Sequence, residues 1–128
     1  MPRGSEMKIA VTSQNFRTIT GHAGKTRRFL VYQADGGEVR EIERLDLPKE
    51  QSFHELHGDA PHPIDGVEVM ITASCGDNFV VRMARRGIRV VATGETDPVT
   101  AARLVSTGQP LPPAAPHEHQ GVGIEGTL

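Results

Sequence analysis

Five short β-prone runs constrain most strongly what this chain can fold into. They are separated by polar or Gly-containing segments and cover residues 8–13, 29–33, 38–45, 67–73 and 88–92. Helix-like patterns appear only after the third run. This order predicts a hairpin meander followed by right-handed crossover units. The expected fold class is α/β: a single three-layer domain with helices packed on a mixed five-stranded sheet.

The expected strands differ in kind. Asp35-Gly36-Gly37 separates the second and third runs and is a strong hairpin signal. In the third run Val39 and Ile42 are out of step with strict alternation, which indicates a β-bulge. Residues 88–92 are predicted to form a buried strand of the parallel kind.

The segment between the third and fourth runs is interpreted as a short helix over residues 48–57. Phe53 and Leu56 stand at helical spacing within it. The Pro-His-Pro sequence at 61–63 must end this helix, because proline cannot continue one.

Two later helices have clearer boundaries. The apolar pattern over residues 77–86 predicts a helix that stops at Gly87. Asp97 is expected to cap the last helix, with Pro98 at its first position and Gly108 near its end.

Length and composition limit the class of protein. The 128 residues suit one domain, expected over 7–108, with disordered ends at 1–6 and in the Pro- and Gly-rich stretch 109–128. The net charge of −2 argues against binding nucleic acid through overall charge. No apolar run approaches the roughly 20 residues of a membrane span. Since the N-terminus also lacks the apolar centre of a signal peptide, a cytoplasmic protein is expected.

Gly24-Lys25-Thr26 imitates a phosphate-binding loop but meets neither requirement of one. The nucleotide-binding pattern needs a glycine where Ile19 stands. It also needs a helix directly after the Lys-Thr pair, because the helix N-terminus holds the phosphate. Residues 29–33 are predicted to form a strand instead, so a nucleotide-binding loop is not expected.

The same loop combines a histidine with glycines and cations. Imidazole is the commonest protein ligand for transition metals, and the cations favour an anionic ligand. Glycines let a bulky ligand approach the backbone closely. A solvated loop histidine and a simple anion-binding rim remain alternative interpretations. The candidate binding residues of the loop are Gly21, His22, Gly24, Lys25, Arg27 and Arg28.

Topology predicts a second residue beside this histidine. If the strand after Gly66 pairs in parallel with the first strand, loops 14–27 and 74–77 leave the same edge of the sheet. They then flank a topological switch point, where open α/β sheets bind ligands. His22 and Cys75 are therefore expected in one neighbourhood.

Cys75 is the single cysteine, which excludes an intramolecular disulfide and a structural zinc site with several thiolates. It precedes a predicted helix, whose dipole would favour the thiolate. A thiolate is a soft ligand suited to iron–sulfur or copper sites. A small residue filling a tight turn is the alternative interpretation.

The other histidines form looser groups. His54, His57 and His62 are candidate metal ligands, although the polar surface of a short helix is the simpler interpretation. His117 and His119 lie among prolines in the tail, where no defined site is expected.

A ribonuclease H-type nuclease would suit the strand order but needs carboxylates on central strands to hold Mg²⁺. Residues 8–13 contain none, Glu68 is the only acid in the fourth run, and Asp77 follows it. No Ser-His-Asp arrangement can be assigned either. A two-metal nuclease is therefore not expected.

Several motifs carry a family resemblance in their order and spacing. Lys-Ile-Ala-Val stands at 8–11, Gly-His-Ala-Gly-Lys at 21–25, Cys-Gly-Asp-Asn-Phe at 75–79 and Gly-Ile-Arg-Val at 87–90. Over about residues 7–108 the chain resembles the dinitrogenase iron–molybdenum cofactor biosynthesis family. This family includes NifX-like carriers and the C-terminal domain of NifB-like proteins.

The resemblance implies a ribonuclease H-like fold and a non-catalytic protein that binds iron–sulfur precursors or the finished cofactor and passes them between assembly proteins. His22 matches the loop histidine of the family, and Lys25 stands where an arginine is usual. Ala23 replaces the usual phenylalanine, and the segment before Gly66 is shorter and richer in histidine.

The leading hypothesis is a cytoplasmic carrier of an iron–sulfur-type cluster, the iron–molybdenum cofactor or a precursor, in nitrogen fixation. Its expected partners are nitrogenase cofactor assembly proteins, with no nucleic acid or membrane, and it is expected to be a monomer or weak homodimer. The alternatives are a protein-interaction or regulatory module without a cluster and a small-anion binding domain. The expected ligands are His22 and Cys75, helped by His54, His57 or His62, with Lys25, Arg27 and Arg28 offsetting the negative charge.

Overall fold

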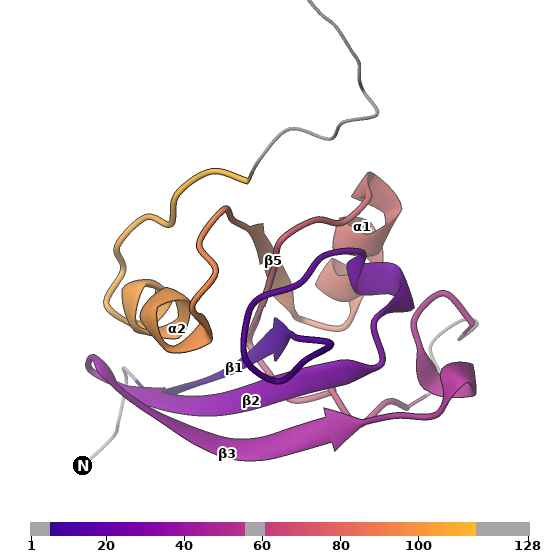
Figure 1. Cartoon of the computed structure of the whole chain (residues 1–128), viewed down its shortest axis with the longest axis horizontal. Coiled ribbons are helices and arrows are strands. Elements are labelled where there is room, and N and C mark those ends of the chain that lie inside the picture. The colour runs from indigo at the N-terminus through magenta and orange to yellow at the C-terminus, as the bar shows by residue number, and fades with distance from the viewer. Residues whose placement is uncertain (1–5, 56–60, 115–128) are drawn as a thin grey trace, which may run out of the picture.

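The computed structural model describes residues 6–55 and 61–114, which form one mixed sheet with a helix on each face (Figure 1). The sheet order is β3-β2-β1-β4-β5. The strands are β1 (Glu6–Thr12), β2 (Arg28–Asp35), β3 (Glu38–Asp46), β4 (Val69–Thr72) and β5 (Arg89–Ala92). The helices are α1 (Asp77–Arg85) and α2 (Pro98–Ser106), and two 3₁₀ turns are η1 (Ala23–Lys25) and η2 (Lys49–Gln51).

The pairing of the strands confirms the predicted topology. β1 pairs antiparallel with β2 and parallel with β4, and β4 pairs parallel with β5. The hairpin between β2 and β3 turns at Gly36 and Gly37, whose φ angles of 59° and 101° lie in the region that glycine favours. The carboxyl ends of β1 and β4 therefore meet at one edge of the sheet.

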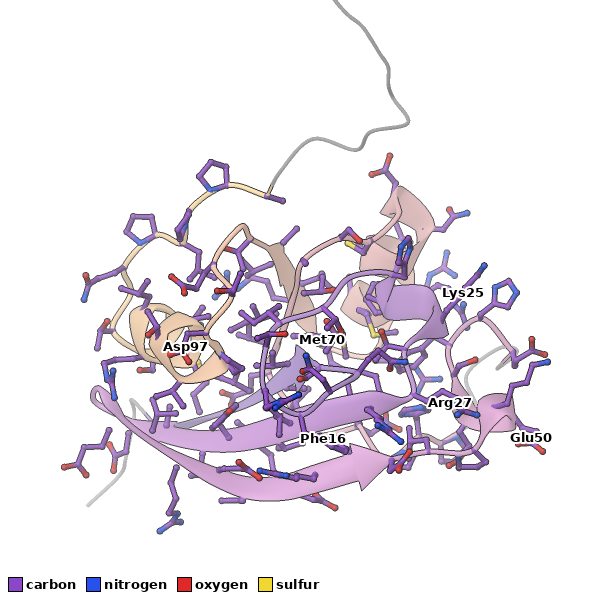
Figure 2. All side chains as sticks on the ribbon, in the orientation of Figure 1. Phe16, Lys25, Arg27, Glu50, Met70 and Asp97 are labelled. Carbon is purple, nitrogen blue, oxygen red and sulfur yellow. The ribbon has the colours of Figure 1, made fainter. Side chains whose placement is uncertain are left out.

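Alternation along the central strands divides the core into two clusters. Met70 of β4 packs with α1 residues such as Met83, and Figure 2 shows Met70 in the middle of the molecule. Its neighbour Ile71 packs on the opposite face with Ala101 and Ala102 of α2. Because successive side chains point to opposite faces, a central strand buried on both sides reads as a continuous apolar run.

The predicted bulge is present in β3. Val31 pairs with Glu43 and Tyr32 pairs with Glu41, so Ile42 is the extra residue on β3. Its side chain is 41% exposed. The bulge therefore accounts for an isoleucine at a position that strict alternation does not explain.

β5 differs from the prediction of a buried strand. It is parallel to β4, as expected, but it is the last strand of the sheet, and its four residues are exposed or half-buried. An apolar run alone does not distinguish a central strand from an edge strand whose two faces are partly covered.

The predicted helix over residues 48–57 is wrong for its described part. Only η2 (Lys49–Gln51) forms, and Ser52 is already extended with a ψ of 150°. The N–H of His54 donates to the carbonyl of Gly24 at 2.6 Å rather than to a helical carbonyl. Burial of Phe53 and this long-range hydrogen bond override a weak helical pattern. Leu56 and His57 lie outside the described residues.

Both predicted helix boundaries in the second half of the chain are confirmed. α1 is followed by Gly87, which has a φ of 79°. The Asp97 carboxylate accepts hydrogen bonds from the Thr100 N–H at 2.9 Å and the Thr100 hydroxyl at 2.6 Å. Pro98 occupies the first turn of α2. Neither helix in the described ranges is long and apolar enough to cross a membrane.

Packing continues beyond the expected domain end at residue 108. The Thr93 hydroxyl donates to the carbonyl of Pro112 at 2.6 Å, and the Gly94 N–H lies 3.1 Å from the carbonyl of Pro113. Leu111 packs against the α2-side core. Residues 1–5, 56–60 and 115–128 lie outside the described part of the chain, so the expectations for the two ends stay predictions there.

Candidate functional site at the carboxyl edge of the sheet

A buried hydroxyl pair joins the two loops that leave the carboxyl ends of β1 and β4. Thr12 and Thr72 are both fully buried, and their Oγ1 atoms are 2.8 Å apart. Each hydroxyl also lies within hydrogen-bonding distance of the Thr20 carbonyl, at 2.6 and 3.2 Å. The Ala73 N–H donates to that same carbonyl at 3.1 Å. Sequence reasoning missed this contact, although a threonine at the end of each of two adjacent strand runs was a visible signal.

His22 lies two residues after Thr20 and takes a left-handed backbone conformation, with φ 55° and ψ 52°. Few residues other than glycine adopt this conformation, and histidine is among those enriched there. The His22 N–H donates to Ser74 Oγ at 2.8 Å, and the Ala23 N–H donates to the Ser74 carbonyl at 3.1 Å. These contacts fix the backbone while leaving the His22 residue exposed.

Gly21 is required by the close approach of Ser74. A Cβ at Gly21 would lie 2.3 Å from Ser74 Oγ and 3.3 Å from Ser74 Cβ. We expect Gly21→Ala to displace the Ser74 side chain, break its hydrogen bond to His22, and lower the free energy of unfolding by about 1–2 kcal/mol. Urea unfolding measures this change.

Gly24→Ala is the matched control for this prediction. A Cβ at Gly24 would meet only Phe79 Cδ1, at 4.0 Å, which is an ordinary contact. The free energy of unfolding of this variant should stay within about 0.5 kcal/mol of the parent. Equal losses in the two variants would contradict the role given to Gly21.

The two loops enclose a hollow of about 290 Å³ at this edge. Its walls confirm that His22 and Cys75 share one neighbourhood, as the topology predicts. Figure 2 shows Lys25 on η1, at the rim of the molecule. The residues that line the hollow are His22, Ala23, Gly24, Lys25, His54, Ser74, Cys75 and Gly76.

Only one of the three predicted loop cations lines this hollow. Lys25 does so, whereas Arg27 and Arg28 do not. The Arg28 guanidinium bonds to Asp46 at 3.3 Å and lies 5.4 Å from the centre of the Phe16 ring. Arg28 is thus engaged in structural contacts away from the hollow.

The loop continues into β2 rather than into a helix. This agrees with the prediction that the loop is not a nucleotide-binding loop.

A second hollow of about 360 Å³ lies on the other side of the same turn. His22 and Lys25 line both hollows, so the turn is a partition between them. The other walls of the second hollow are Gln14, Thr20, Gly21 and Thr26. Its lining includes no sulfur and contains two threonine hydroxyls and one glutamine amide.

The remaining predicted ligands separate into two groups. His54 is exposed and lines the 290 Å³ hollow, whereas His57 lies outside the described residues. His62 is 5% exposed, and both its ring nitrogens have partners. Nε2 lies 2.7 Å from the Gln51 carbonyl, and Nδ1 accepts from the Ile64 N–H at 3.0 Å. His62 therefore has a structural position and does not join the hollow.

The Cys75 thiol differs from the thiolate expected at a helix start. Burial is the main cause that raises its pKa, and the negative charge of Asp77 adds to the effect. Cys75 is half-buried and packs against the α1-side core. Both causes raise the pKa further above neutral pH, so the thiol is protonated at neutral pH in the free protein.

The described residues offer no complete single-ion site. Within 6–55 and 61–114, no three side chains of the histidine, cysteine, aspartate or glutamate type come together to hold a metal ion. The 290 Å³ hollow nevertheless presents one thiol, two imidazoles and one ammonium group. Such a set suits a ligand that is itself large, anionic and rich in soft atoms.

Solved structures define the class of fold. A Methanocaldococcus jannaschii protein, described provisionally as a dinitrogenase, has a TM-score of 0.60 at 15% identity, covering 81% of this chain and 91% of that one. A Thermotoga protein, described provisionally as NifB, has a TM-score of 0.54 at 19% identity, covering 90% and 99%. The chain therefore shares a small mixed-sheet α/β fold with these proteins.

The family follows from a match over most of the chain. The profile described as Dinitrogenase iron-molybdenum cofactor matches residues 5–108. The chain belongs to this family, which confirms the resemblance inferred from its motifs. No curated protein matches the chain at a significant level.

Proposed function

We propose that this protein is a non-catalytic carrier that holds an anionic iron–sulfur-type cluster, the iron–molybdenum cofactor or a precursor, and passes it between nitrogenase cofactor assembly proteins. Membership of the family supports the association with this cofactor. The strand order β3-β2-β1-β4-β5 also supports the description of the fold as ribonuclease H-like.

The observation that carries the proposal is the convergence of His22, Cys75 and Lys25 on one hollow. Imidazole and thiol are ligands for iron–sulfur clusters, and an ammonium group offsets their negative charge. A volume of about 290 Å³ lies near the lower end of the range typical of small-ligand pockets. The hollow thus suits one compact cluster held at its edge.

The donor set also suits temporary rather than permanent binding. A resident iron–sulfur cluster is usually held by four cysteines, whereas this chain has only Cys75. A cluster held by one thiol and one or two imidazoles keeps positions open for the ligands of a receiving protein. We therefore assign His22 and Cys75 as the primary ligands and His54 as the third candidate.

Anaerobic titration of the protein with purified iron–molybdenum cofactor tests this assignment. We expect His22→Ala and Cys75→Ser each to weaken binding at least tenfold, which corresponds to about 1.4 kcal/mol. Lys25→Ala should weaken it less, in a salt-dependent way. Arg40→Ala removes an exposed charge of β3 outside the hollow and is the control. Unchanged affinity in both ligand variants would refute the site.

The raised pKa of Cys75 adds a pH signature to this test. The thiol must lose its proton to coordinate metal, so cluster binding releases a proton. Affinity should therefore increase as the pH rises from 7 toward the pKa of the thiol. In Cys75→Ser this increase in affinity should be absent. If the increase came from a general change in the charge of the protein, it would remain in this variant.

Binding of a small anion is a second candidate function, favoured by the 360 Å³ hollow. Its hydroxyl and amide groups and Lys25 suit phosphate or a carboxylate. This alternative predicts thermal stabilisation by inorganic phosphate that is equal in Cys75→Ser and in the parent, and absent in Lys25→Ala. A protein-interaction module without a ligand predicts stabilisation by neither phosphate nor cluster.

A further inference from the structure

The outer edge of β5 has open main-chain groups. Arg89 and Thr93 donate their N–H groups to Glu68 and Thr72 on the β4 side, at 3.0 and 2.9 Å. Alternation directs the N–H and C=O groups of Val90 and Ala92 away from the sheet. Neither of these two N–H groups donates to an acceptor in the described ranges. An open edge of this kind is a template for one more strand.

Hollows lie on both sides of this edge. On the α1 side a hollow of about 350 Å³ is lined by Arg89 and by apolar residues that include Val80, Ala84 and Val90. Val80 and its neighbour Val81 are 40% and 49% exposed, which is unusual among the large apolar residues described. On the α2 side a hollow of about 370 Å³ is lined by Arg89 and Val91, among others. A strand added at β5 would direct alternate side chains into the two hollows.

The course of the chain favours its own C-terminal segment as the occupant. The described chain ends at residue 114, directly after the contacts of Pro112 and Pro113 with Thr93 and Gly94. These contacts lie at the carboxyl end of β5, so a continuation that turns back would run antiparallel to β5. Fourteen residues, 115–128, remain for this path.

Charge and pattern favour the same occupant over a second copy of the chain. Arg89 is an exposed cation of β5 itself, so two copies pairing through β5 would bring their Arg89 side chains to one seam. Residues 115–128 contain no lysine or arginine and two glutamates. They also contain Gly-Val-Gly-Ile-Glu at 121–125, in which apolar residues alternate with glycine.

We propose that residues 122–125 add to β5 as a sixth, antiparallel strand. Ile124 pairs opposite Val90 and Val122 opposite Ala92, so that both apolar side chains enter the α1-side hollow. Glu125 is then opposite Arg89 on the other face, where the charges attract. Residues 115–121 make the turn. This docking uses only β5, α1 and the tail, and it does not depend on the cluster-carrier function.

Amide hydrogen exchange in the full chain tests the docking. We expect the Val90 and Ala92 N–H groups to exchange at least tenfold more slowly in residues 1–128 than in a chain that ends at residue 114. Ile124→Asp should produce the fast exchange of the shortened chain. Thr127→Asp, a matched change outside the paired residues, should keep the slow exchange. Unchanged exchange of the Ile71 N–H shows that every variant is folded.

Charge reversal tests the register. Arg89→Glu should accelerate exchange at Val90, and combining it with Glu125→Arg should restore slow exchange. Equal exchange in the full and shortened chains would overturn the proposal. Protection that depends on protein concentration and survives Ile124→Asp would identify a second copy instead and would also overturn it. Failure of the double reversal to restore protection would overturn the register.

Discussion

Phe53→Ala is expected to lower the free energy of unfolding by about 3–5 kcal/mol, because it removes a fully buried aromatic ring. The ring stacks on His62 with a centroid distance of 4.2 Å and meets the edge of Phe79 at 5.7 Å. The Arg86 guanidinium lies 5.6 Å from its centre. Urea unfolding monitored by circular dichroism measures the loss.

Phe16→Ala is the matched control for that substitution. Phe16 is half-buried, and the guanidinium groups of Arg28 and Arg44 each lie 5.4 Å from its ring centre. It therefore has cation contacts of the same type as Phe53 but lacks complete burial. We expect a loss of about 1 kcal/mol. Similar losses in the two variants would show that burial of Phe53 is not the dominant contribution.

His62→Ala is expected to cost about 2–4 kcal/mol, because it leaves the Gln51 carbonyl and the Ile64 N–H without their hydrogen-bond partner. It also removes the stacking on Phe53. The imidazole thereby links Gln51 to Ile64, and His54, three residues after Gln51, lines the proposed cluster hollow. His54→Ala is the control, since His54 is exposed.

His62 also predicts a pH dependence of stability. Burial is the main cause that lowers the pKa of His62 below its ordinary value of 6.5, and the positive charge of Arg86 lowers it further. Below about pH 6.5 the unfolded chain therefore binds a proton that the folded chain does not. The stability is fully present above this pH and is lost as the pH falls toward the folded-state pKa.

Unfolding curves between pH 8 and pH 5 measure this effect. The free energy of unfolding should be nearly constant down to about pH 7 and then decline in the parent and in His54→Ala. In His62→Ala the decline over this window should be largely absent. A decline of equal steepness in all three proteins would assign the pH dependence to other groups.

Local pattern predicted much of this fold. The hairpin at Gly36, the bulge at Ile42 and the cap at Asp97 each depend on a few neighbouring residues, so their chemistry is readable along the chain. The predicted helix over 48–57 was wrong in its described part, because distant partners decided its backbone. One such partner is Gly24, whose carbonyl binds the N–H of His54.

The site was predicted in part. Parallel pairing of β1 with β4 was sufficient to bring His22 and Cys75 to one edge, since strand direction determines where loops leave a sheet. The role of Arg28 could not be predicted, because its partner Asp46 becomes a neighbour only through the pairing of β2 with β3. The same is true of His62, whose spacing suggests a ligand and whose burial makes it a structural residue.

By itself, the sequence determined the order of the strands along the chain and, through its motifs, the family to which the chain belongs. The strands follow from periodicity and local turn chemistry, which act between near neighbours. Only the tertiary structure decided that Lys25 lines the 290 Å³ hollow, that the Cys75 thiol is protonated and that β5 has an open edge. Each of these three features depends on burial and on contacts between distant segments. Spacing along the chain encodes neither burial nor such contacts.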